Sequence, residues 1–309
     1  MKKIVTVTLN PALDKSIAVP KMIPEKKLRC TDAKVEPGGG GINVSRAIHK
    51  LGGETEAVFL SGGYTGKHFE SLMAAENIRS VALPIKGNMR ENFVVLDTSS
   101  HLQYRFGMDG PMINEEEWMQ VLTHIQNETA VDYIVASGSL PPGVPADYFG
   151  RLAMIAQQKK AKLIVDTSGD ALQYAVKQGV YLIKPNLGEL SNLYGKESLA
   201  NDEVLMAARS IIEKGGCEIM VVSMGSEGAM LITNDRQIQV KPPQVVIQST
   251  VGAGDSMVGG IVLALSKGWD LGDTLCYGVA AGTAATLNPG TELCKKEDTE
   301  RIFEELKQQ

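Results

Sequence analysis

The sequence predicts an α/β fold built on a mostly parallel β-sheet. Short apolar runs of strand length alternate with segments of helical spacing along almost the whole chain of 309 residues. The apolar runs are near-continuous, which is typical of strands buried on both faces of a parallel sheet. Several runs are followed by polar loops that contain glycine, and α/β proteins bind ligands at the carboxyl ends of their strands. We therefore expect a helix-covered sheet with a ligand site along one edge.

The first half of the chain begins this alternation. Residues 4–9 predict a strand, and residues 42–51 predict a helix that ends at two glycines, a frequent way for a helix to terminate. Residues 57–60 predict the next strand, and residues 69–75 lie in a helical pattern.

The second half continues the pattern and ends in helices. Further apolar strands are expected at residues 134–136, 163–165, 181–183 and 219–222. Helices are expected at residues 255–267, 271–287 and 297–307.

Two segments break the alternation and predict a small accessory sheet. Residues 16–36 have no helical pattern and carry two prolines between extended pieces. Residues 91–107 predict a hairpin in which F-V-V-L-D and L-Q-Y-R-F flank the turn T-S-S-H. We expect this sheet to act as a lid or a dimer surface, with an ordinary peripheral hairpin as the alternative. The chain is interpreted as a single domain, residues 1–309, with lid segments at about 12–37 and 88–108.

Composition and charge exclude several classes of function. The net charge of −5 leaves no basic surplus for neutralising the phosphates of a nucleic acid. The start of the chain reads as a strand rather than a signal peptide, and no run of 18 apolar residues predicts a membrane span. The four cysteines are far apart and lack zinc-ligand spacing, so free thiols and a cytoplasmic location are expected.

The stretch from residue 249 to residue 260, S-T-V-G-A-G-D-S-M-V-G-G, predicts an anion site at the start of a helix. Its glycines allow the backbone amides to point one way, and a helix N-terminus offers unpaired donors and a partial positive charge. Asp255 is placed to accept a proton beside a bound phosphate. The alternative is that Asp255 only caps the helix.

A second glycine cluster, P-G-G-G-G-I-N at residues 37–43, runs into another predicted helix. Ordering each glycine costs about 0.5–1 kcal/mol, which favours a site of close backbone approach to a ligand over a flexible connection. Asn43 has the donor and the acceptor needed to bind hydroxyls.

Two nucleotide-binding motifs are excluded. The nearest match to a Walker P-loop lies at residues 61–68 but has Ser61 and His68 where the motif requires glycine and a hydroxyl residue. No G-x-G-x-x-G follows a strand, so a dinucleotide-binding fold is unsupported.

Three polar loops follow predicted strands: S-G-S-L-P-P at 137–142, K-P-N-L-G-E at 184–189 and S-M-G-S-E-G at 223–228. Together they suit one long ligand that crosses the sheet edge. Asn186 and Glu189 share a face of a first helical turn and suit a hydrated Mg²⁺ beside phosphates. A capping box is the alternative for this pair.

Basic and acidic residues in the extended segments are candidates for binding a sugar phosphate. Arg90, Lys27 and Arg29 suit the phosphate, with solvated surface charge as the alternative for each; Arg105 is interpreted as surface charge. Asp14 follows N-P-A-L and suits sugar hydroxyls, or is a turn residue.

These motifs together resemble the ribokinase/PfkB family of sugar kinases. The resemblance covers nearly the whole chain and rests on N-P-A-L-D, P-G-G-G-G-I-N-V, G-S-L-P-P-G, K-P-N-x-x-E, S-x-G-x-x-G and T-V-G-A-G-D-S in that order. Q-Y-R-F and K-L-R-C are most similar to the phosphosugar branch, and within it to 6-phosphofructokinases of the minor-isozyme type. The resemblance implies a ribokinase-like three-layer sandwich with a small accessory β-sheet lid.

The resemblance also implies a role for each matching position. Asp255 would be the base, and amides of Gly252, Ala253 and Gly254 the anion hole for the γ-phosphoryl group. Sugar contacts would come from Asp14, Gly39, Gly40, Gly41, Asn43 and Ser139, with Arg90 and Lys27 on the sugar phosphate. ATP would be bound by Lys184, Asn186, Ser223, Gly225, Gly228, Val251, Val279 and Thr283, with Asn186 and Glu189 ordering Mg²⁺. K⁺ would be bound by Ser249, Val251, Ala285, Asn288 and Gly290.

One departure from the close relatives concerns the ion site. They carry Arg where this chain has Glu292, which puts the affinity and selectivity of the K⁺ site in doubt while leaving the phosphoryl-transfer residues intact. In some relatives Lys27 reaches across a dimer formed by the two accessory sheets, so a homodimer is expected.

The resemblance implies an ATP- and Mg²⁺-dependent kinase that phosphorylates fructose 6-phosphate at its 1-hydroxyl. Tagatose 6-phosphate and fructose 1-phosphate are alternative substrates, because all three present a phosphate and similar hydroxyls. A non-catalytic sugar-phosphate sensor is the alternative of another class, and a nucleoside kinase is disfavoured by the Lys27 and Arg90 pair.

Overall fold

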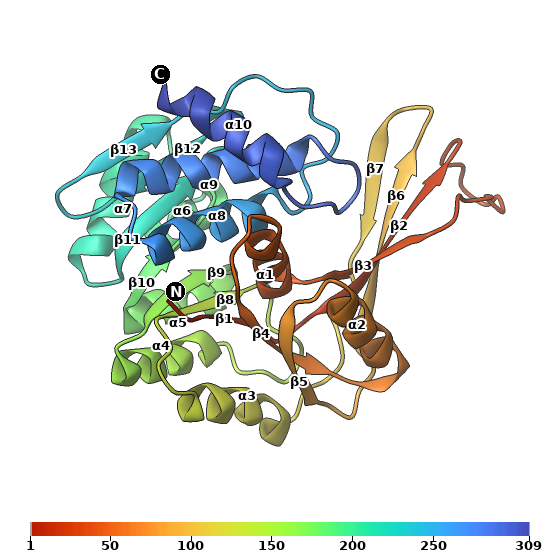
Figure 1. Cartoon of the computed structure of the whole chain (residues 1–309), viewed down its shortest axis with the longest axis horizontal. Coiled ribbons are helices and arrows are strands. Elements are labelled where there is room, and N and C mark those ends of the chain that lie inside the picture. Colours follow the sequence, from red (N-terminus) through yellow and green to blue (C-terminus); the bar gives the residue numbers. More distant parts are fainter. Residues whose placement is uncertain (1, 309) are drawn as a thin grey trace.

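The computed structural model describes residues 2–308, and within that range it contains a main sheet and a smaller accessory sheet (Figure 1). The main sheet has the strand order β13-β12-β11-β10-β9-β8-β1-β4-β5. Its strands are β1 Ile4–Thr8, β4 Glu56–Ser61, β5 Arg79–Pro84, β8 Tyr133–Ser137, β9 Lys162–Asp166, β10 Val180–Ile183, β11 Cys217–Ser223, β12 Ala229–Ile232 and β13 Gln237–Val240. From β5 to β11 neighbouring strands are parallel, which confirms the mostly parallel sheet.

Helices cover both faces of the main sheet, so the body has three layers (Figure 1). One face carries α1 Gly40–Lys50, α8 Ala253–Lys267, α9 Leu271–Thr286 and α10 Lys296–Lys307. The other carries α3 Glu115–Asn127, α4 Tyr148–Lys159, α5 Gly169–Gln178, α6 Leu187–Tyr194 and α7 Val204–Glu213. Helix α2, Gly63–Ala75, packs near the accessory sheet.

The apolar strands are buried because their side chains alternate between two cores. In β1, Val5 and Val7 enter the core with α3 to α7, while Ile4 enters the core with α8 to α10. All three are at most 2% exposed. Burying a side chain of this size contributes about 1.5–3 kcal/mol, so a strand with no polar face needs helices on both sides.

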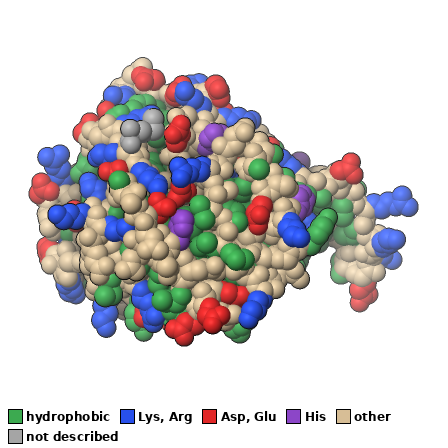
Figure 2. Space-filling model, turned by 60° about the horizontal axis from the view of Figure 1, so that its bottom comes forward, with side chains coloured by type: hydrophobic (Ala, Val, Ile, Leu, Met, Phe, Trp, Pro, Cys, Tyr) green, Lys and Arg blue, Asp and Glu red, His purple; other side chains and the backbone are tan. Residues whose placement is uncertain are grey.

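The accessory sheet confirms the predicted hairpin and the extended segment before it. Its strands are β2 Ala12–Val19, β3 Lys34–Gly38, β6 Arg90–Asp97 and β7 Leu102–Phe106, in the order β3-β2-β6-β7. The sheet projects from the body as a separate arm (Figure 1), and Lys and Arg side chains gather at its tip in Figure 2. Exposed residues of the β2–β3 connection include Lys26, Lys27 and Arg29.

The strands that the sequence analysis did not identify lie at the edges of the main sheet. β12 and β13 run antiparallel to their neighbours, and β13 alternates polar and apolar residues as Q-I-Q-V. β5, at the opposite edge, has no fully buried position. β5 and β13 are edge strands with exposed positions, so they lack the continuous apolar signal of the central strands, whereas β12, A-M-L-I, is buried throughout and was missed although it carries that signal.

The rest of the surface is unremarkable in charge. In Figure 2 acidic and basic side chains are interspersed over the body, without a broad basic patch on that face. No helix within residues 2–308 has the length and apolar character needed to span a bilayer.

Candidate active site

The polar loops predicted from the sequence meet at the carboxyl edge of the main sheet. β8, β9, β10 and β11 are neighbours, and each ends in a polar residue or leads into a polar loop. Asn186 forms a bridge with Ser223, whose amide donates to the carbonyl oxygen of Pro185 at 2.9 Å. The loops after β8, β10 and β11 therefore line one continuous edge, as expected.

Helix α8 begins at the glycine-rich stretch and presents its N-terminus to this edge. Gly252 is the N-cap, with a positive φ of 74° that favours glycine. Asp255 lies in the first turn, three residues after the cap, and its side chain accepts a hydrogen bond from Asn43. The alternative that Asp255 merely caps the helix is therefore wrong. The first-turn amides have no partner within the helix, so the turn is suited to an anion.

The carboxylate of Asp255 is held by Asn43. The Asn43 Nδ2 atom donates to Asp255 Oδ2 at 2.9 Å, which joins the start of α1 to the start of α8. Burial, and next the nearby charge of Asp166, raise the pKa of Asp255 from 3.8 to about 7, against the lowering effects of Asn43 and Lys184. An acid with a pKa near neutrality is suited to accept and release a proton.

Lys184 and Asp166 form a buried ion pair beside Asp255. Lys184 Nζ lies 3.2 Å from Asp166 Oδ1, and the lysine side chain is 7% exposed. Although burial lowers the pKa of Lys184, Asp166, Glu189 and Asp255 raise it further, so the ammonium stays charged. Sequence reasoning missed Asp166. It directly follows the apolar run at 163–165, the same position that drew attention to the other strand-end loops.

Substituting Asp166 is expected to change the pH dependence of the site. A carboxylate accepts a proton only when it is deprotonated, so for any reaction that uses Asp255 as a base kcat/KM should rise as pH increases through about 7. Asp166→Asn removes a negative neighbour, which lowers the pKa of Asp255 and moves this acidic limb to lower pH. Steady-state profiles of kcat/KM test the shift, with Asp235→Asn in an exposed turn as the control. If the acidic limb stays at the same pH, Asp166 does not influence the pKa of Asp255.

The glycine cluster at 38–41 is explained by packing within the protein. A Cβ on Gly40 would lie 2.3 Å from Ser137 Oγ and 2.5 Å from the Gly138 amide nitrogen, and a Cβ on Gly38 would lie 1.9 Å from an Asp14 oxygen. Gly39, the N-cap of α1, has a φ of 107°. These glycines let α1 begin directly against the ends of β1, β2 and β8, which brings Asn43 to Asp255.

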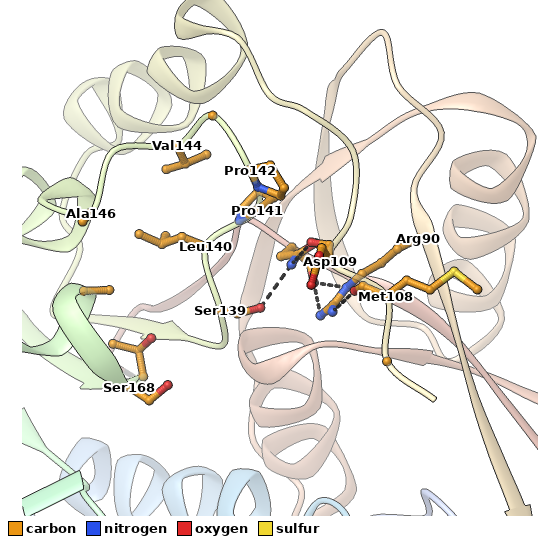
Figure 3. A pocket seen from close by; sticks show the side chains of 15 residues that line it. Arg90, Met108, Asp109, Ser139, Leu140, Pro141, Pro142, Val144, Ala146 and Ser168 are labelled. Atoms are coloured by element: carbon orange, nitrogen blue, oxygen red, sulfur yellow. Dashed lines mark hydrogen bonds between the residues drawn. The ribbon is translucent and has the colours of Figure 1, made fainter. Parts of the chain in front are cut away.

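A cavity of about 650 Å³ lies beside this edge, between the accessory sheet and the loop after β8 (Figure 3). In Figure 3, Arg90 and Asp109 lie on one side and the loop with Leu140 and Pro141 on the other. The Arg90 guanidinium donates to the carbonyl oxygens of Asn10 and Met108 at 2.7–3.2 Å. The volume of this cavity is typical of a small-molecule binding site.

Two further predicted sugar ligands lie near this cavity. Ser139 lines it and accepts a hydrogen bond from Asn10 Nδ2 at 3.1 Å. Asp14, on β2, accepts a hydrogen bond from Asn92 Nδ2 at 2.9 Å, and burial raises its pKa. Lys27 is not brought to this group, since it is exposed in the connection between β2 and β3.

The predicted magnesium pair forms a capping box. The Asn186 side chain accepts from the Glu189 amide at 2.9 Å, and the Glu189 carboxylate accepts from the Asn186 amide at 2.8 Å. The capping alternative is therefore present in the structure. Burial, and next the charge of Asp166, raise the pKa of Glu189, so a cation nearby would stabilise its ionised form.

The remaining predicted nucleotide positions differ in accessibility. Gly225 and Gly228 have positive φ values of 59° and 85° in the turn after β11. Val279 is 1% exposed within the core, and the Thr283 hydroxyl donates to the Val279 carbonyl oxygen at 2.7 Å. Val251 is half-buried in the loop before α8.

The segments predicted to bind K⁺ lie against each other. The Ser249 hydroxyl donates to the Gly290 carbonyl oxygen at 2.7 Å and accepts from the Val251 amide at 3.2 Å. Hydroxyl and carbonyl oxygens are ligands that fit a hard cation. Glu292 is paired with Lys34 of β3 at 2.6 Å, so its charge is neutralised by the accessory sheet.

The accessory sheet also contacts the loop before α8. The Arg105 guanidinium donates to Thr250 Oγ1 at 3.2 Å, and the Ser249 hydroxyl lies 3.5 Å from Gln103 Oε1. Arg105 was interpreted as surface charge. It is exposed, yet it joins β7 to the glycine-rich stretch.

Comparisons with known proteins agree with this arrangement. The model of the pfkB family of carbohydrate kinases matches residues 5–298. The chain is 45% identical over 304 residues to the ATP-dependent 6-phosphofructokinase isozyme 2 of Escherichia coli K12, which covers 98% of both chains. Crystal structures of Escherichia coli phosphofructokinase-2 with potassium (45% identical) and with fructose-6-phosphate (44% identical) both have a TM-score of 0.95, covering 99% of this chain and 100% of theirs.

The sequence matches one family over nearly its whole length. The same chain has the strand order, the accessory sheet and the first turn of α8 described above. The fold is ribokinase-like, as predicted, with the smaller sheet beside a large, mostly parallel one. The chain belongs to the pfkB family of carbohydrate kinases.

Proposed function

We propose that the protein is an ATP-dependent kinase that phosphorylates fructose 6-phosphate at the 1-hydroxyl to give fructose 1,6-bisphosphate. The observation that carries this proposal is Asp255, whose pKa is raised to about 7 in the first turn of α8 beside unpaired amides. The similarity to 6-phosphofructokinase isozyme 2 supports the choice of sugar. The cavity lined by Arg90 and Ser139 supports binding of a small polar substrate at the same edge of the sheet.

In the proposed reaction Asp255 accepts the proton of the 1-hydroxyl. The sugar oxygen forms a bond to the γ-phosphorus of ATP, the bond to the bridging β–γ oxygen breaks, and ADP leaves. Amides of Gly252, Ala253 and Gly254 stabilise the charge on the transferring group, and Asn43 orients the carboxylate. Because the transition state of phosphoryl transfer is loose, positioning and charge stabilisation carry most of the rate enhancement.

We assign the sugar and the nucleotide to different parts of the carboxyl edge of the main sheet. We assign the sugar to Asp14, Asn43, Ser139 and the glycines at 39–41, with Arg90 on its phosphate. The nucleotide is assigned to the loops after β10 and β11, with Lys184 beside its phosphates. The positions proposed there are Lys184, Asn186, Ser223, Gly225, Gly228, Val251, Val279 and Thr283.

Two cations are proposed to assist. Glu189 with Asn186 would order Mg²⁺, which supplies charge neutralisation on the phosphates. Oxygen atoms of Ser249, Val251, Ala285, Asn288 and Gly290 would hold K⁺ beside the start of α8. Because Lys34 neutralises Glu292, we expect the departure at that position to leave K⁺ binding intact.

We propose that the active form is a homodimer joined by the accessory sheets, each closing as a lid over its sugar site. Exposed apolar side chains on β7 and the segment after it support an interface there: Leu102, Tyr104, Phe106 and Met108. Such a dimer would bring Lys27 of one chain to the sugar phosphate of the other.

The four free cysteines and the ATP substrate support a cytoplasmic location.

The assay for this proposal measures ADP release with Mg²⁺-ATP and each of three sugars: fructose 6-phosphate, tagatose 6-phosphate and fructose 1-phosphate. A kcat/KM at least about a hundredfold higher for fructose 6-phosphate is expected, which is roughly 2.7 kcal/mol of transition-state discrimination. Equal values for the two 6-phosphates would favour a tagatose-6-phosphate kinase, and a preference for fructose 1-phosphate would favour a 1-phosphofructokinase. Binding without ADP release would favour the sensor alternative.

A further inference from the structure

A second cluster of ionisable side chains lies at the opposite edge of the main sheet from the active site. Glu56 begins β4, His124 lies in the last turn of α3, and Glu128 is the C-cap of that helix. The start of β4 is its amino end, whereas the residues assigned to the reaction follow the carboxyl ends of the strands. The proposed kinase chemistry therefore assigns no role to this cluster.

The ligand atoms of the three side chains converge. His124 Nε2 lies 3.8 Å from Glu56 Oε1 and 3.6 Å from Glu128 Oε1, and the three atoms lie within 4.8 Å of one another. The Glu56 side chain is 3% exposed. Among the residues that the structure describes, Glu56 Oε1 and His124 Nε2 are buried without a hydrogen-bond partner. Leaving a buried polar atom without a hydrogen bond costs free energy of folding, so these two atoms are candidates for binding a ligand.

The outer oxygens of both carboxylates are already held. Arg79 Nη2 lies 2.7 Å from Glu56 Oε2, and the Lys3 ammonium donates to Glu128 Oε2. These contacts fix the orientation of the carboxylates; Glu128 Oε1 then lies toward His124, and Glu56 Oε1 lies 3.8 Å from both His124 Nε2 and the Lys3 ammonium. Outer contacts of this kind orient the ligands of protein metal sites.

We propose that Glu56, His124 and Glu128 form a binding site for a divalent cation of the Zn²⁺ type. Bonds of about 2.1 Å in a tetrahedral site place ligand atoms roughly 3.4 Å apart. The two separations from His124 then need to contract by a few tenths of an ångström, and the separation between the two carboxylate oxygens, which is within 4.8 Å, by at most about 1.4 Å. One nitrogen and two carboxylate oxygens suit Zn²⁺, whereas Mg²⁺ and Ca²⁺ prefer sites made of oxygen alone.

Access and coordination number are consistent with a small cation. A cavity of about 440 Å³ opens beside Glu56 and is lined also by Glu54, Lys2, Lys3 and Arg79, so it reaches the cluster from the side of Glu56 and not from that of His124 and Glu128. Three protein ligands leave a fourth position for water. The competing explanation is that the cluster is only a network of ion pairs of Glu56 and Glu128 with Lys3 and Arg79, in which case the protein would not bind the metal here.

The test is calorimetric titration of the full-length, chelator-treated protein with ZnCl₂. It is made in a Cys30→Ser background, because Cys30 is an exposed free thiol that also binds zinc. We expect one equivalent of Zn²⁺ to bind, and His124→Gln and Glu128→Gln to weaken binding by roughly a hundredfold or more. His68→Ala, an exposed histidine on α2, is the matched control and should bind unchanged.

Two further readings make the test decisive. Thermal unfolding without metal shows whether each variant is folded, and Zn²⁺ should raise the Tm of the parent but not of folded His124→Gln. Co²⁺ should give the visible absorption of a four-coordinate site in the parent only. Absence of Zn²⁺ binding, or equal binding by parent and His124→Gln, would overturn the proposal in favour of the ion-pair network.

Discussion

Replacing Asp255 with Asn is expected to lower kcat by about 10²- to 10⁴-fold while leaving the affinities for both substrates nearly unchanged. Asn keeps the size of the side chain and can still contact Asn43, but it cannot accept the proton of the sugar hydroxyl. The measurement is steady-state ADP release with Mg²⁺-ATP and fructose 6-phosphate, together with direct titration of each substrate. Near-normal turnover would remove Asp255 from the role of base.

The same substitution is expected to stabilise the fold. Because the pKa of Asp255 is raised from 3.8 to about 7, its ionised form is disfavoured in the native state. Stability is therefore lost as pH rises from about 4 to 7, by at most about 4 kcal/mol. Asp255→Asn should recover this at pH 8 and show no gain below pH 4, as measured by chemical denaturation. A variant that is both inactive and more stable would exclude misfolding as the cause of lost turnover.

Replacing Gly40 with Ala is expected to lower both the stability of the fold and kcat. The added Cβ would lie 2.3–2.6 Å from Ser137 Oγ, the Gly138 nitrogen and the Ser137 carbonyl carbon, and two of these are backbone atoms. Helix α1 must then move away from the end of β8, at a cost of about 1–3 kcal/mol for overpacking. Since α1 carries Asn43, we also expect kcat to fall at least tenfold.

The matched control is Gly188→Ala in the first turn of α6. There the added Cβ would meet only Asn186 Oδ1, at 3.4 Å, so alanine fits and should raise stability by about 0.4–1 kcal/mol. Chemical denaturation and kcat are measured for both variants. Equal behaviour of the two would contradict the view that close approach at Gly40 positions the base.

The strand-end loops and the glycine-rich stretch were predictable because their chemistry is local. A glycine pair before an Asp, or an Asn with a Glu three residues later, encodes a turn and a helix start in a few consecutive residues. The hairpin of β6 and β7 was predictable for the same reason, since its two apolar arms flank a short polar turn.

Contacts between distant segments were not predictable from one sequence. The sequence placed Asn43 at the sugar but did not show that it also pairs with Asp255, 212 residues away. Asp166 and Lys184 form their ion pair only because β9 and β10 are neighbours in the sheet. The glycines at 38–41 were assigned to close approach of a ligand, and the structure adds a packing reason that one sequence does not reveal, because their immediate neighbours are protein atoms from β1, β2 and β8.

The identity of the product tests the central claim most directly. The protein is incubated with Mg²⁺-ATP and fructose 6-phosphate, and phosphorus NMR follows the phosphate esters as they form. We predict a new phosphate monoester on the 1-hydroxyl of the sugar, in equal amount to ADP, with the 6-phosphate retained. Unchanged sugar phosphate, or ADP formed without a second sugar ester, would contradict an Asp255-assisted transfer to fructose 6-phosphate.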